Sequence, residues 1–377
     1  MNKSNKIKVA FLGGGINSAV GRAHKIALEM DKRYELVSGC FSRNIDINMQ
    51  TAIEYGVSTK RVYDNLNELI EQEKNKIDAI IILTPTPNHK NEVIKCIKNN
   101  IAVICEKALA SSSEEAFEIE EELKRNNGFL AVTYNYTGYP MLRELKNMIS
   151  DGKLGKIEQV HIEMPQEGFL RLNENGDPIV PQEWRLHDEK LPVISLDLGT
   201  HTHDIISFLT LEEPVSLVAV QNSFGSFKKL VDNVMCIAHY TSNLVCNIWY
   251  SKSTLGHRNG LRVRVYGELG SAEWYQLEPE NLYYNNNKGQ RFILDRASTD
   301  VNIASQARYN RFKAGHPSGF IEAFSNYYSD IYDCIKLNTI KNNKYVYGVR
   351  NALEGLIMLE AINKSSENKG WINLNDK

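Results

Sequence analysis

The sequence predicts an α/β protein in two parts: a doubly wound parallel sheet over residues 1–135, and an α+β domain with a large, mainly antiparallel sheet over residues 136–377. Three observations support this fold class. Short apolar segments alternate with helical patterns through the first part, and a glycine cluster follows the first segment. Beyond residue 214, closely spaced strand patterns separated by turn residues predict antiparallel pairing. A chain of 377 residues is also long for one core, so two domains are expected.

Composition and charge indicate which classes of binding partner are not expected. The net charge is −2, from 44 basic and 46 acidic residues, and no basic block stands out. This balance argues against nucleic acid and against anionic membranes as partners. No apolar run approaches the roughly 20 residues of a membrane helix, and the N-terminal apolar stretch is too short for a secretion signal. We therefore expect a cytoplasmic protein without a membrane partner.

The six cysteines show no paired short spacing, and most lie in apolar contexts. We interpret them as buried thiols of a reducing compartment and expect no metal site; a zinc site or a redox pair is the alternative.

The first part alternates strand and helix patterns, and each strand pattern is short, apolar and not alternating. Such segments suit strands buried on both faces of a parallel sheet. The predicted strands are 8–13, 35–41, 79–84, 102–106 and 129–134, with helices near 22–31, 46–55, 64–74, 88–99 and 112–127.

The second part shows a different pattern of secondary structure. We expect a helix at 140–150, a strand at 157–165, a polar irregular stretch at 166–192 and a helix near 199–209. The strand patterns that follow lie at 215–222, 233–240, 243–251, 261–268, 271–277 and 281–285. An extended loop over 295–318 and helices near 319–337 and 348–364 complete the chain.

The glycine turn after the first strand predicts a dinucleotide site. A diphosphate needs close backbone approach, free N–H groups and the positive end of a helix dipole, and side chains would block it. The usual G-x-G-x-x-G spacing is stretched, because Gly21 lies six residues after Gly15. Asn17 and Ser18 could then act as extra phosphate donors. The residues assigned to this contact are Gly13, Gly15, Ile16 and Asn17.

The residues at the end of the second strand indicate which cofactor binds. An NAD site commonly places a carboxylate there for the ribose hydroxyls. This chain has Ser42 and Arg43 instead, and Arg43 would attract a 2′-phosphate. We expect NADP or NAD, with NADP favoured; alternatively Arg43 stacks on adenine and NAD is used.

Polar and charged residues end the next two strands. Thr84, Pro85 and His89 follow the third, and Glu106 and Lys107 end the fourth. Because strand C-termini of a doubly wound sheet face the ligand crevice, we assign all five to the cofactor site and expect Lys107 at the nicotinamide end.

A later pattern, Asp197-x-Gly199-x-His201-x-x-Asp204, leads into the helix near 199–209. With the glycine turn, the Thr84–Pro85 strand end and Glu106–Lys107, it makes the chain resemble the Gfo/Idh/MocA family of glucose–fructose oxidoreductase and inositol dehydrogenase. The resemblance covers nearly the whole length. It implies a Rossmann domain, hydride transfer between NAD(P) and a secondary alcohol of a sugar, inositol or related polyol, and catalytic roles for Lys107, Asp197 and His201.

Physical chemistry supports these roles. Removing a hydride from a carbinol requires that the hydroxyl proton depart, and a base titrating near neutrality, such as His201, suits that step. The ammonium of Lys107 would stabilise alkoxide character. Asp197 lies one helical turn before His201 and could orient the imidazole or contact the substrate, whereas His203 should point away. The alternative for His201 is a structural histidine that caps the helix.

Further substrate contacts are predicted from two stretches. Asn135 and Tyr136 follow the fifth strand and could bind hydroxyls, or pack at a hinge. Trp184 could offer a stacking ring and Arg185 an anion clamp, with a salt bridge at the rim as the alternative. We expect His316 to fix a loop.

Two departures from the family matter. Ala108 replaces the usual proline after the lysine, so special peptide geometry there is not guaranteed. The glycine-rich stretch before the Asp is here "KLPVIS" at 190–195, which leaves the substrate's identity open.

We therefore predict an NAD(P)-dependent sugar or polyol dehydrogenase. The alternatives are an NAD-dependent glycoside hydrolase that acts by transient oxidation, and a non-catalytic dinucleotide-binding sensor. The resemblance also implies a homodimer or homotetramer formed through the C-terminal sheet.

Overall fold

The computed structural model divides the chain into two compact units, each with its own sheet. The structure describes residues 6–341 and 343–374. The units comprise Met1–Gly138 with Phe320–Leu353, and Tyr139–Gly319 with Glu354–Lys377. The predicted fold class is confirmed, because one sheet is parallel and the other is mainly antiparallel.

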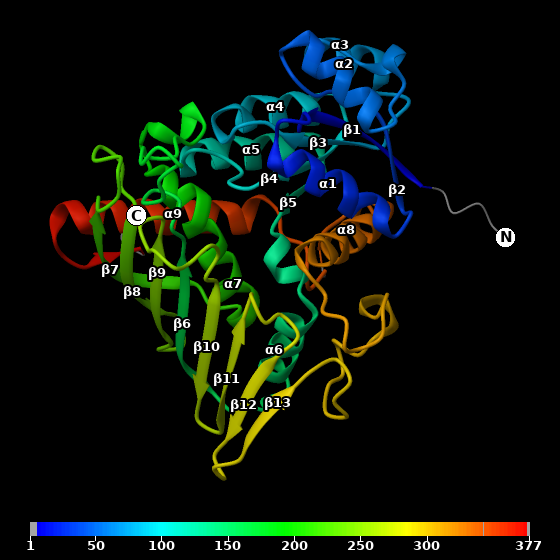
Figure 1. Cartoon of the computed structure of the whole chain (residues 1–377). Helices are drawn as coiled ribbons and strands as arrows, with labels where there is room; N and C mark the ends of the chain where they lie inside the picture. The colour runs from blue at the N-terminus through cyan, green and yellow to red at the C-terminus, as the bar shows by residue number, and fades with distance from the viewer. Residues whose placement is uncertain (1–5, 342, 375–377) are drawn as a thin grey trace. The chain divides into compact units, whose positions relative to one another are not determined.

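The first unit is built from alternating strands and helices, close to the predicted ranges (Figure 1). Their bounds are β1 Ile7–Gly13, α1 Ala19–Met30, β2 Tyr34–Cys40, α2 Ile45–Glu54, α3 Leu66–Glu73, β3 Ala79–Leu83, α4 Thr86–Lys98, β4 Ala102–Glu106, α5 Ser113–Asn126 and β5 Leu130–Thr133. Within the described residues the strand order is β2–β1–β3–β4–β5, all parallel. The order reverses direction between β1 and β3, where an open parallel sheet places its ligand.

A late segment completes the first unit, although the sequence prediction placed it with residues 136–377. Helix α8, Phe320–Lys336, packs against α1. The hydroxyl of Tyr327 donates to the carbonyl of Val132, at 2.7 Å, and Tyr34 donates to the carbonyl of Tyr328, at 2.8 Å. The aromatic face of α8 is thereby buried. A single apolar stripe in the sequence could not show which sheet it would cover.

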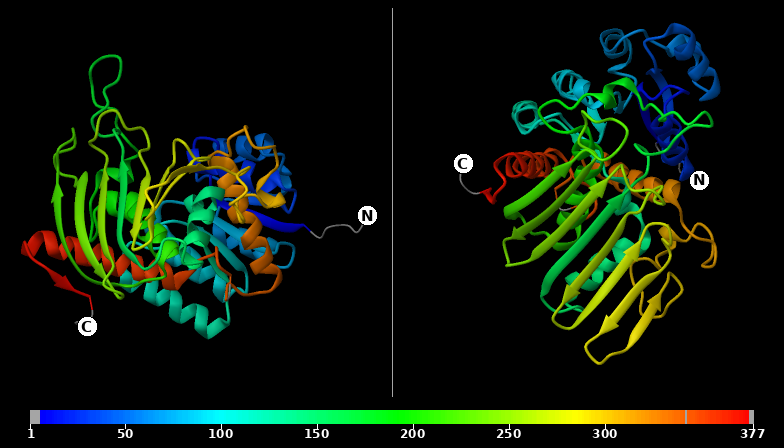
Figure 2. Two further views of the ribbon diagram at one scale, coloured as in Figure 1. Left: turned by 90° about the horizontal axis from the view of Figure 1, so that it is seen from below. Right: turned by 60° about the vertical axis from the view of Figure 1, so that its left-hand side comes forward.

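The second unit contains a large twisted sheet (Figure 2). Its strands are β6 Ile157–Pro165, β7 Pro214–Asn222, β8 Asn233–Tyr240, β9 Val245–Ser251, β10 Arg262–Gly267, β11 Gly270–Tyr275, β12 Leu282–Asn286, β13 Arg291–Leu294 and β14 Ile372–Asn373. Among the described residues their order is β13–β12–β11–β10–β6–β9–β8–β7–β14. All neighbours are antiparallel except β6 and β9. Sequence reasoning missed β13 and β14.

Helices α6, Pro140–Ser150, and α7, Thr200–Thr210, cover one face of this sheet. Helix α9, Val349–Asn368, reaches the same unit, where Ser365 accepts from the backbone of Ala219 at 2.9 Å. Residues that alternate with the buried ones on the strands lie on the opposite face.

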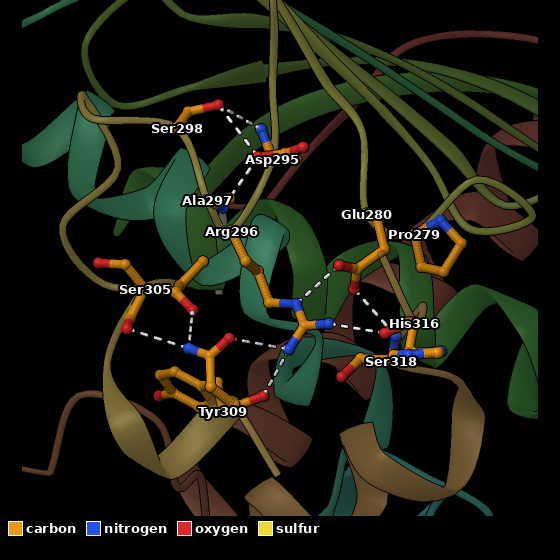
Figure 3. A network of polar contacts seen from close by, with 12 residues as sticks. Pro279, Glu280, Asp295, Arg296, Ala297, Ser298, Ser305, Tyr309, His316 and Ser318 are labelled. Atoms are coloured by element: carbon orange, nitrogen blue, oxygen red, sulfur yellow. Dashed lines mark hydrogen bonds and ion pairs between the residues drawn. The ribbon is translucent and has the colours of Figure 1, made fainter. Parts of the chain in front are cut away.

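The region predicted as an extended loop at 295–318 is a loop held by buried charge (Figure 3). The guanidinium of Arg296, only 3% exposed, donates to the carboxylate of Glu280 at 2.6 Å. It also donates to the backbone carbonyls of Tyr309 and His316, each at 2.8 Å. His316 therefore enters this network through its carbonyl oxygen.

Among the residues that the structure describes, no helix is long and apolar enough to cross a membrane. All six cysteines lie buried as thiols. In residues 6–341 and 343–374, no group of three His, Cys, Asp or Glu side chains is arranged to hold a metal ion.

Candidate functional site

The glycine turn lies where the strand order of the first unit reverses. Gly13 and Gly14 have φ values of +82° and +72°, which favour glycine. A Cβ on Gly13 would lie 2.9 Å from the backbone of Leu83 and Thr84, and one on Gly21 would lie 2.0 Å from the Gly14 oxygen. The turn therefore needs glycine both for its conformation and for the close approach of α1.

Helix α2 and the residue that follows it form hydrogen bonds with this turn. The Ile16 N–H donates to the hydroxyl of Thr51 at 3.1 Å, and the Tyr55 hydroxyl donates to the Gly14 carbonyl at 3.1 Å. The Ser18 N–H donates to the Gly15 carbonyl at 2.7 Å. Two of the N–H groups in the turn are thus engaged within the protein, so Ile16 would contact a diphosphate with atoms other than its N–H.

A dinucleotide diphosphate fits this turn. The positions that a Cβ would fill are left open by glycine, and α1 begins at Ala19, directly after the turn. Its N-terminal dipole favours an anion there. Asn17 is exposed beside the turn, as its predicted role requires.

A buried asparagine organises the end of β2. The side-chain oxygen of Asn48, on α2, accepts from the Phe41 N–H at 2.7 Å, and its amide donates to the Tyr63 carbonyl at 3.0 Å. Ser42 accepts from the Asn44 N–H at 3.1 Å, while the Arg43 side chain is exposed. Both predicted residues of the adenosine end therefore follow a strand end that is held by hydrogen bonds from Asn48.

At the end of β3, the Thr84 hydroxyl donates to Glu92 at 2.5 Å, and Pro85 precedes α4. Burial raises the pKa of Glu92 to about 7, although the Thr84 hydrogen bond lowers it. The ring of His89 lies between two backbone carbonyls, those of Thr84 at 2.7 Å and Ala108 at 2.8 Å. Burial lowers the pKa of His89, although these bonds oppose the shift. His89 thus joins the ends of β3 and β4 and uses both ring nitrogens to do so.

The end of β4 carries the predicted catalytic lysine. The peptide bond between Lys107 and Ala108 is cis, although alanine replaces the family's proline. Glu106 turns inward: its Oε1 lies 2.9 Å from His24 Nε2 and accepts from the hydroxyl of Thr133. Burial alone raises the pKa of Glu106, but His24, Lys107 and Thr133 hold it below its ordinary value. The Glu106 carboxylate therefore anchors the strand end that presents Lys107.

The residues after β5 form a short 3₁₀ turn, Asn135–Gly138. Asn135 and Tyr136 are both buried, and Tyr136 packs edge-on against Phe320. Among the described residues, no acceptor meets the Asn135 side-chain nitrogen. A buried amide without an acceptor is the kind of group that a ligand would satisfy.

In the second unit, the predicted catalytic carboxylate lies between two cations. Asp197 belongs to a π-helical turn, Ser195–Gly199, that precedes α7. Arg185 donates to Asp197 Oδ2 at 2.6 Å, and Lys252 donates to the same oxygen. The guanidinium of Arg185 lies 4.3 Å from the Trp184 ring centre. Arg185 thus forms a salt bridge, which was the alternative to an anion clamp.

The histidines of α7 lie in different surroundings. His201, 5% exposed, is in the first turn. Burial lowers the pKa of His203 to about 4. Burial also raises the pKa of Asp204 well above its ordinary value, against the charge of Lys146. His203 and Asp204 therefore favour their neutral forms at neutral pH.

Sequence reasoning missed several residues that shape these sites: His24, Asn48, Thr51, Glu92, Lys252 and Tyr328. No motif marks Lys252, which simply follows β9. His24 lies on the helix after the glycine turn, and nothing local indicates that it would meet Glu106.

Two stretches of the chain match models of one protein family. Residues 7–134 match an oxidoreductase family with an NAD-binding Rossmann fold. Residues 142–273 match the C-terminal domain of the Gfo/Idh/MocA proteins.

Individual relatives align with nearly all of the chain. An oxidoreductase from Sinorhizobium meliloti is 30% identical, with a TM-score of 0.85 over 98% of this chain and 99% of that one. An inositol dehydrogenase homologue from Azotobacter vinelandii, solved with NADH and myo-inositol, is 26% identical, with a TM-score of 0.88 over 98% and 97%. An uncharacterised oxidoreductase of Bacillus subtilis is 27% identical over 386 residues, which cover 98% of this chain and 97% of the relative.

Proposed function

This chain belongs to the Gfo/Idh/MocA family of NAD-binding oxidoreductases, and from that membership we propose that it transfers a hydride between a nicotinamide cofactor and a secondary alcohol or ketone of a sugar, inositol or related polyol. The observation that supports this most directly is the glycine cradle at Gly13 and Gly21, where side chains would obstruct a diphosphate. The Azotobacter relative, solved with NADH and myo-inositol, supports a polyol as the class of substrate.

Three side chains carry the chemistry in this proposal. His201 accepts the hydroxyl proton, since an imidazole ordinarily titrates near neutrality. Lys107 donates a hydrogen bond to the same oxygen and stabilises its developing negative charge. Asp197 accepts a hydrogen bond from a substrate hydroxyl. When bound, the nicotinamide ring supplies the site that accepts or returns the hydride.

Further contacts complete the proposal. On the cofactor side, Thr84, Pro85, Ser42 and Arg43 would line the dinucleotide. On the substrate side, Asn135, Tyr136, Trp184 and Arg185 would orient the hydroxyls. The unmet amide of buried Asn135 supports that assignment.

The test of this function is kinetic. Lys107→Ala and His201→Ala should abolish turnover of sugars and inositols while calorimetry still detects cofactor binding. Lys288→Ala, at an exposed position between β12 and β13, is the matched control for the lysine variant and should keep full activity. Full activity in both catalytic variants would refute the assigned roles. Cleavage of aryl glycosides without net change in nicotinamide absorbance would instead indicate the hydrolase.

We propose NADP as the favoured coenzyme, with NAD also accepted. The β2 end offers Arg43, exposed and cationic, and no carboxylate at residues 41–43. Arg43→Ala should raise the KM for NADP about tenfold or more and leave the KM for NAD nearly unchanged. An equal effect on both coenzymes would indicate adenine stacking instead.

We also propose that copies of the chain associate through the uncovered sheet face. Val220, Met235 and Ile237 are about half exposed there, and Val220 pairs with Met235 across β7 and β8. Such an apolar patch is costly in water. Met235→Glu with Ile237→Glu should lower the molar mass measured by light scattering, whereas an unchanged mass would exclude this interface.

A further inference from the structure

Thr84 lies beside the glycine turn, directly after β3. A Cβ on Gly13 would lie 2.9 Å from the Thr84 backbone nitrogen, so the turn and this strand end are neighbours where the strand order reverses. Because β3 lies between β1 and β4, Thr84 is on the side of the turn toward Lys107 and away from Arg43. Thr84 is only half-buried, which leaves part of the residue open to a ligand.

Two side chains of α4 hold Thr84 in place. His89 Nε2 lies 2.7 Å from the Thr84 carbonyl oxygen, and the Thr84 hydroxyl donates to Glu92 at 2.5 Å. Residues three positions apart on a helix are neighbours on its surface, so His89 and Glu92 act from one face of α4. This face therefore fixes both the backbone and the hydroxyl of Thr84.

The hydrogen bond to Glu92 decides which role the Thr84 hydroxyl can play toward a ligand. A hydroxyl has one proton and two lone pairs, whereas an ionised carboxylate can only accept. While Glu92 is ionised, the Thr84 proton is committed to it, and the Thr84 oxygen can accept from a ligand but cannot donate to a phosphate. A protonated Glu92 can itself donate, which releases the Thr84 proton toward the ligand.

Glu92 can change its charge near neutral pH. Burial raises its pKa to about 7, and the Thr84 hydrogen bond opposes the shift. The titratable side chains beside it are His89 and Cys96 on α4, Cys105 on β4 and Cys40 at the end of β2. Burial raises the pKa of each thiol above its ordinary value and lowers the pKa of His89. These neighbours therefore favour their neutral forms at pH 7, where Glu92 titrates.

We propose that Glu92 is a positioning residue for the coenzyme, whose carboxylate keeps Thr84 as an acceptor for a hydroxyl or amide donor of the nicotinamide riboside half. The inference rests on the proposed function, since it assumes that a nicotinamide coenzyme binds at the glycine turn. A glutamine would occupy the same space with no charge to bury, so the acid lowers the stability of the fold above pH 7. An acid kept at such a cost beside a binding site is typical of a functional group.

The test is calorimetric titration with NADH at pH 8. Glu92→Leu leaves the Thr84 hydroxyl without this acceptor and should weaken binding about fivefold. Glu92→Gln, whose amide oxygen still accepts from Thr84, should stay within about twofold of the wild type. In a Thr84→Val background, Glu92→Leu should have almost no effect, because the hydroxyl that it positions is gone. Equal losses in both backgrounds would overturn the proposal and leave Glu92 a structural role.

The pH dependence gives a second readout. Because the ionised form of Glu92 favours binding, NADH affinity should rise with pH through 7, and binding at pH 6.5 should release about half a proton, measured in two buffers of different ionisation enthalpy. Glu92→Gln should lose this release. Glu71→Gln, at an exposed position of α3, is the matched control and should behave as the wild type. Equal proton release in the wild type and Glu92→Gln would overturn the proposal.

Two further outcomes separate the donor groups and the two proposals. ADP-ribose keeps the ribose hydroxyls but lacks the nicotinamide carboxamide. A Glu92→Leu loss that persists with ADP-ribose would assign the donor to a hydroxyl, and a loss confined to NADH would assign it to the carboxamide. If the wild type binds neither NADH nor NADPH, the proposed dehydrogenase function itself fails. If it binds them and Glu92→Leu binds equally well, only the role of Glu92 is overturned.

Discussion

His24 Nε2 lies 2.9 Å from Glu106 Oε1, and both side chains are buried at the junction of α1 and β4. The other ring nitrogen of His24 lies 2.5 Å from the Tyr328 hydroxyl on α8. A neutral imidazole satisfies both partners if it donates to Glu106 and accepts from Tyr328. One histidine thus links the helix after the glycine turn, the strand that presents Lys107, and α8.

Removing this histidine should destabilise the first unit. His24→Leu leaves the Glu106 carboxylate buried with the Thr133 hydroxyl but without its histidine partner, which costs on the order of 3–5 kcal/mol. Because the folded pKa of Glu106 is below its ordinary value, its stabilisation is present above that ordinary value and is lost as pH falls through the folded pKa. Urea denaturation should show a larger deficit at pH 8 than at pH 4. Tyr328→Phe, which removes one hydroxyl, should cost about 1 kcal/mol; equal losses in the two variants would contradict this role of His24.

Glu92 should make stability fall as pH rises. Its folded pKa of about 7 is above the ordinary value, so stability is fully present below about pH 4.5 and is lost as pH rises through 7. Glu92→Gln has no charge to bury and should be more stable than the wild type at pH 8.5, by on the order of 1–3 kcal/mol. Thermal melts at pH 4.5 and 8.5 measure this. Glu71→Gln, at an exposed position, should show no such pH-dependent gain.

The stability of Gly355→Ala distinguishes the effect of helix propensity from the effect of packing. A Cβ there would lie 2.9 Å from Cδ2 of His203 on α7. Helix propensity alone would make Gly355→Ala stabilising by about 1 kcal/mol, whereas overpacking costs about 1–3 kcal/mol. We expect a lower Tm. The double variant with His203→Ala should recover stability in a double-mutant cycle, and additive effects would show that the two residues do not meet.

Gly21→Ala tests the cofactor turn. The added Cβ would lie 2.0 Å from the Gly14 oxygen, so α1 and the turn must separate. Calorimetric titration should show NADH and NADPH binding at least tenfold weaker. Gly168→Ala, with no atom within 4 Å of its Cβ, is the control and should bind both normally. Unchanged affinity in Gly21→Ala would place the diphosphate elsewhere.

Local sequence features predicted most elements closely. The observed β6, Ile157–Pro165, and β8, Asn233–Tyr240, coincide with their predicted ranges. Their alternation or apolar runs repeat over several residues, and turn residues bound them. The π-helical turn at Ser195–Gly199 was not foreseen, because a regular helical spacing was assumed and no residue type signals an i→i+5 turn.

The residues of the candidate site were likewise predictable only where local sequence features specify them. The glycine turn was identified because backbone conformation restricts residue type within a few positions, and a strand followed by a helix locates it. Lys252 was missed because lysine is common after strands, and its contact with Asp197 depends on where β9 ends relative to α7.

By itself, the sequence determined most of the order of strands and helices, the glycine turn and the candidate residues for the chemistry, because periodicity and turn chemistry act over short spans. Only the tertiary structure decided that α8 joins the first unit, that Glu106 turns inward to His24, and that Arg185 and Lys252 share Asp197. Those contacts join residues up to 304 positions apart. Where they bury charge they are also selective, since a desolvated ion must find an opposite charge or a hydrogen bond.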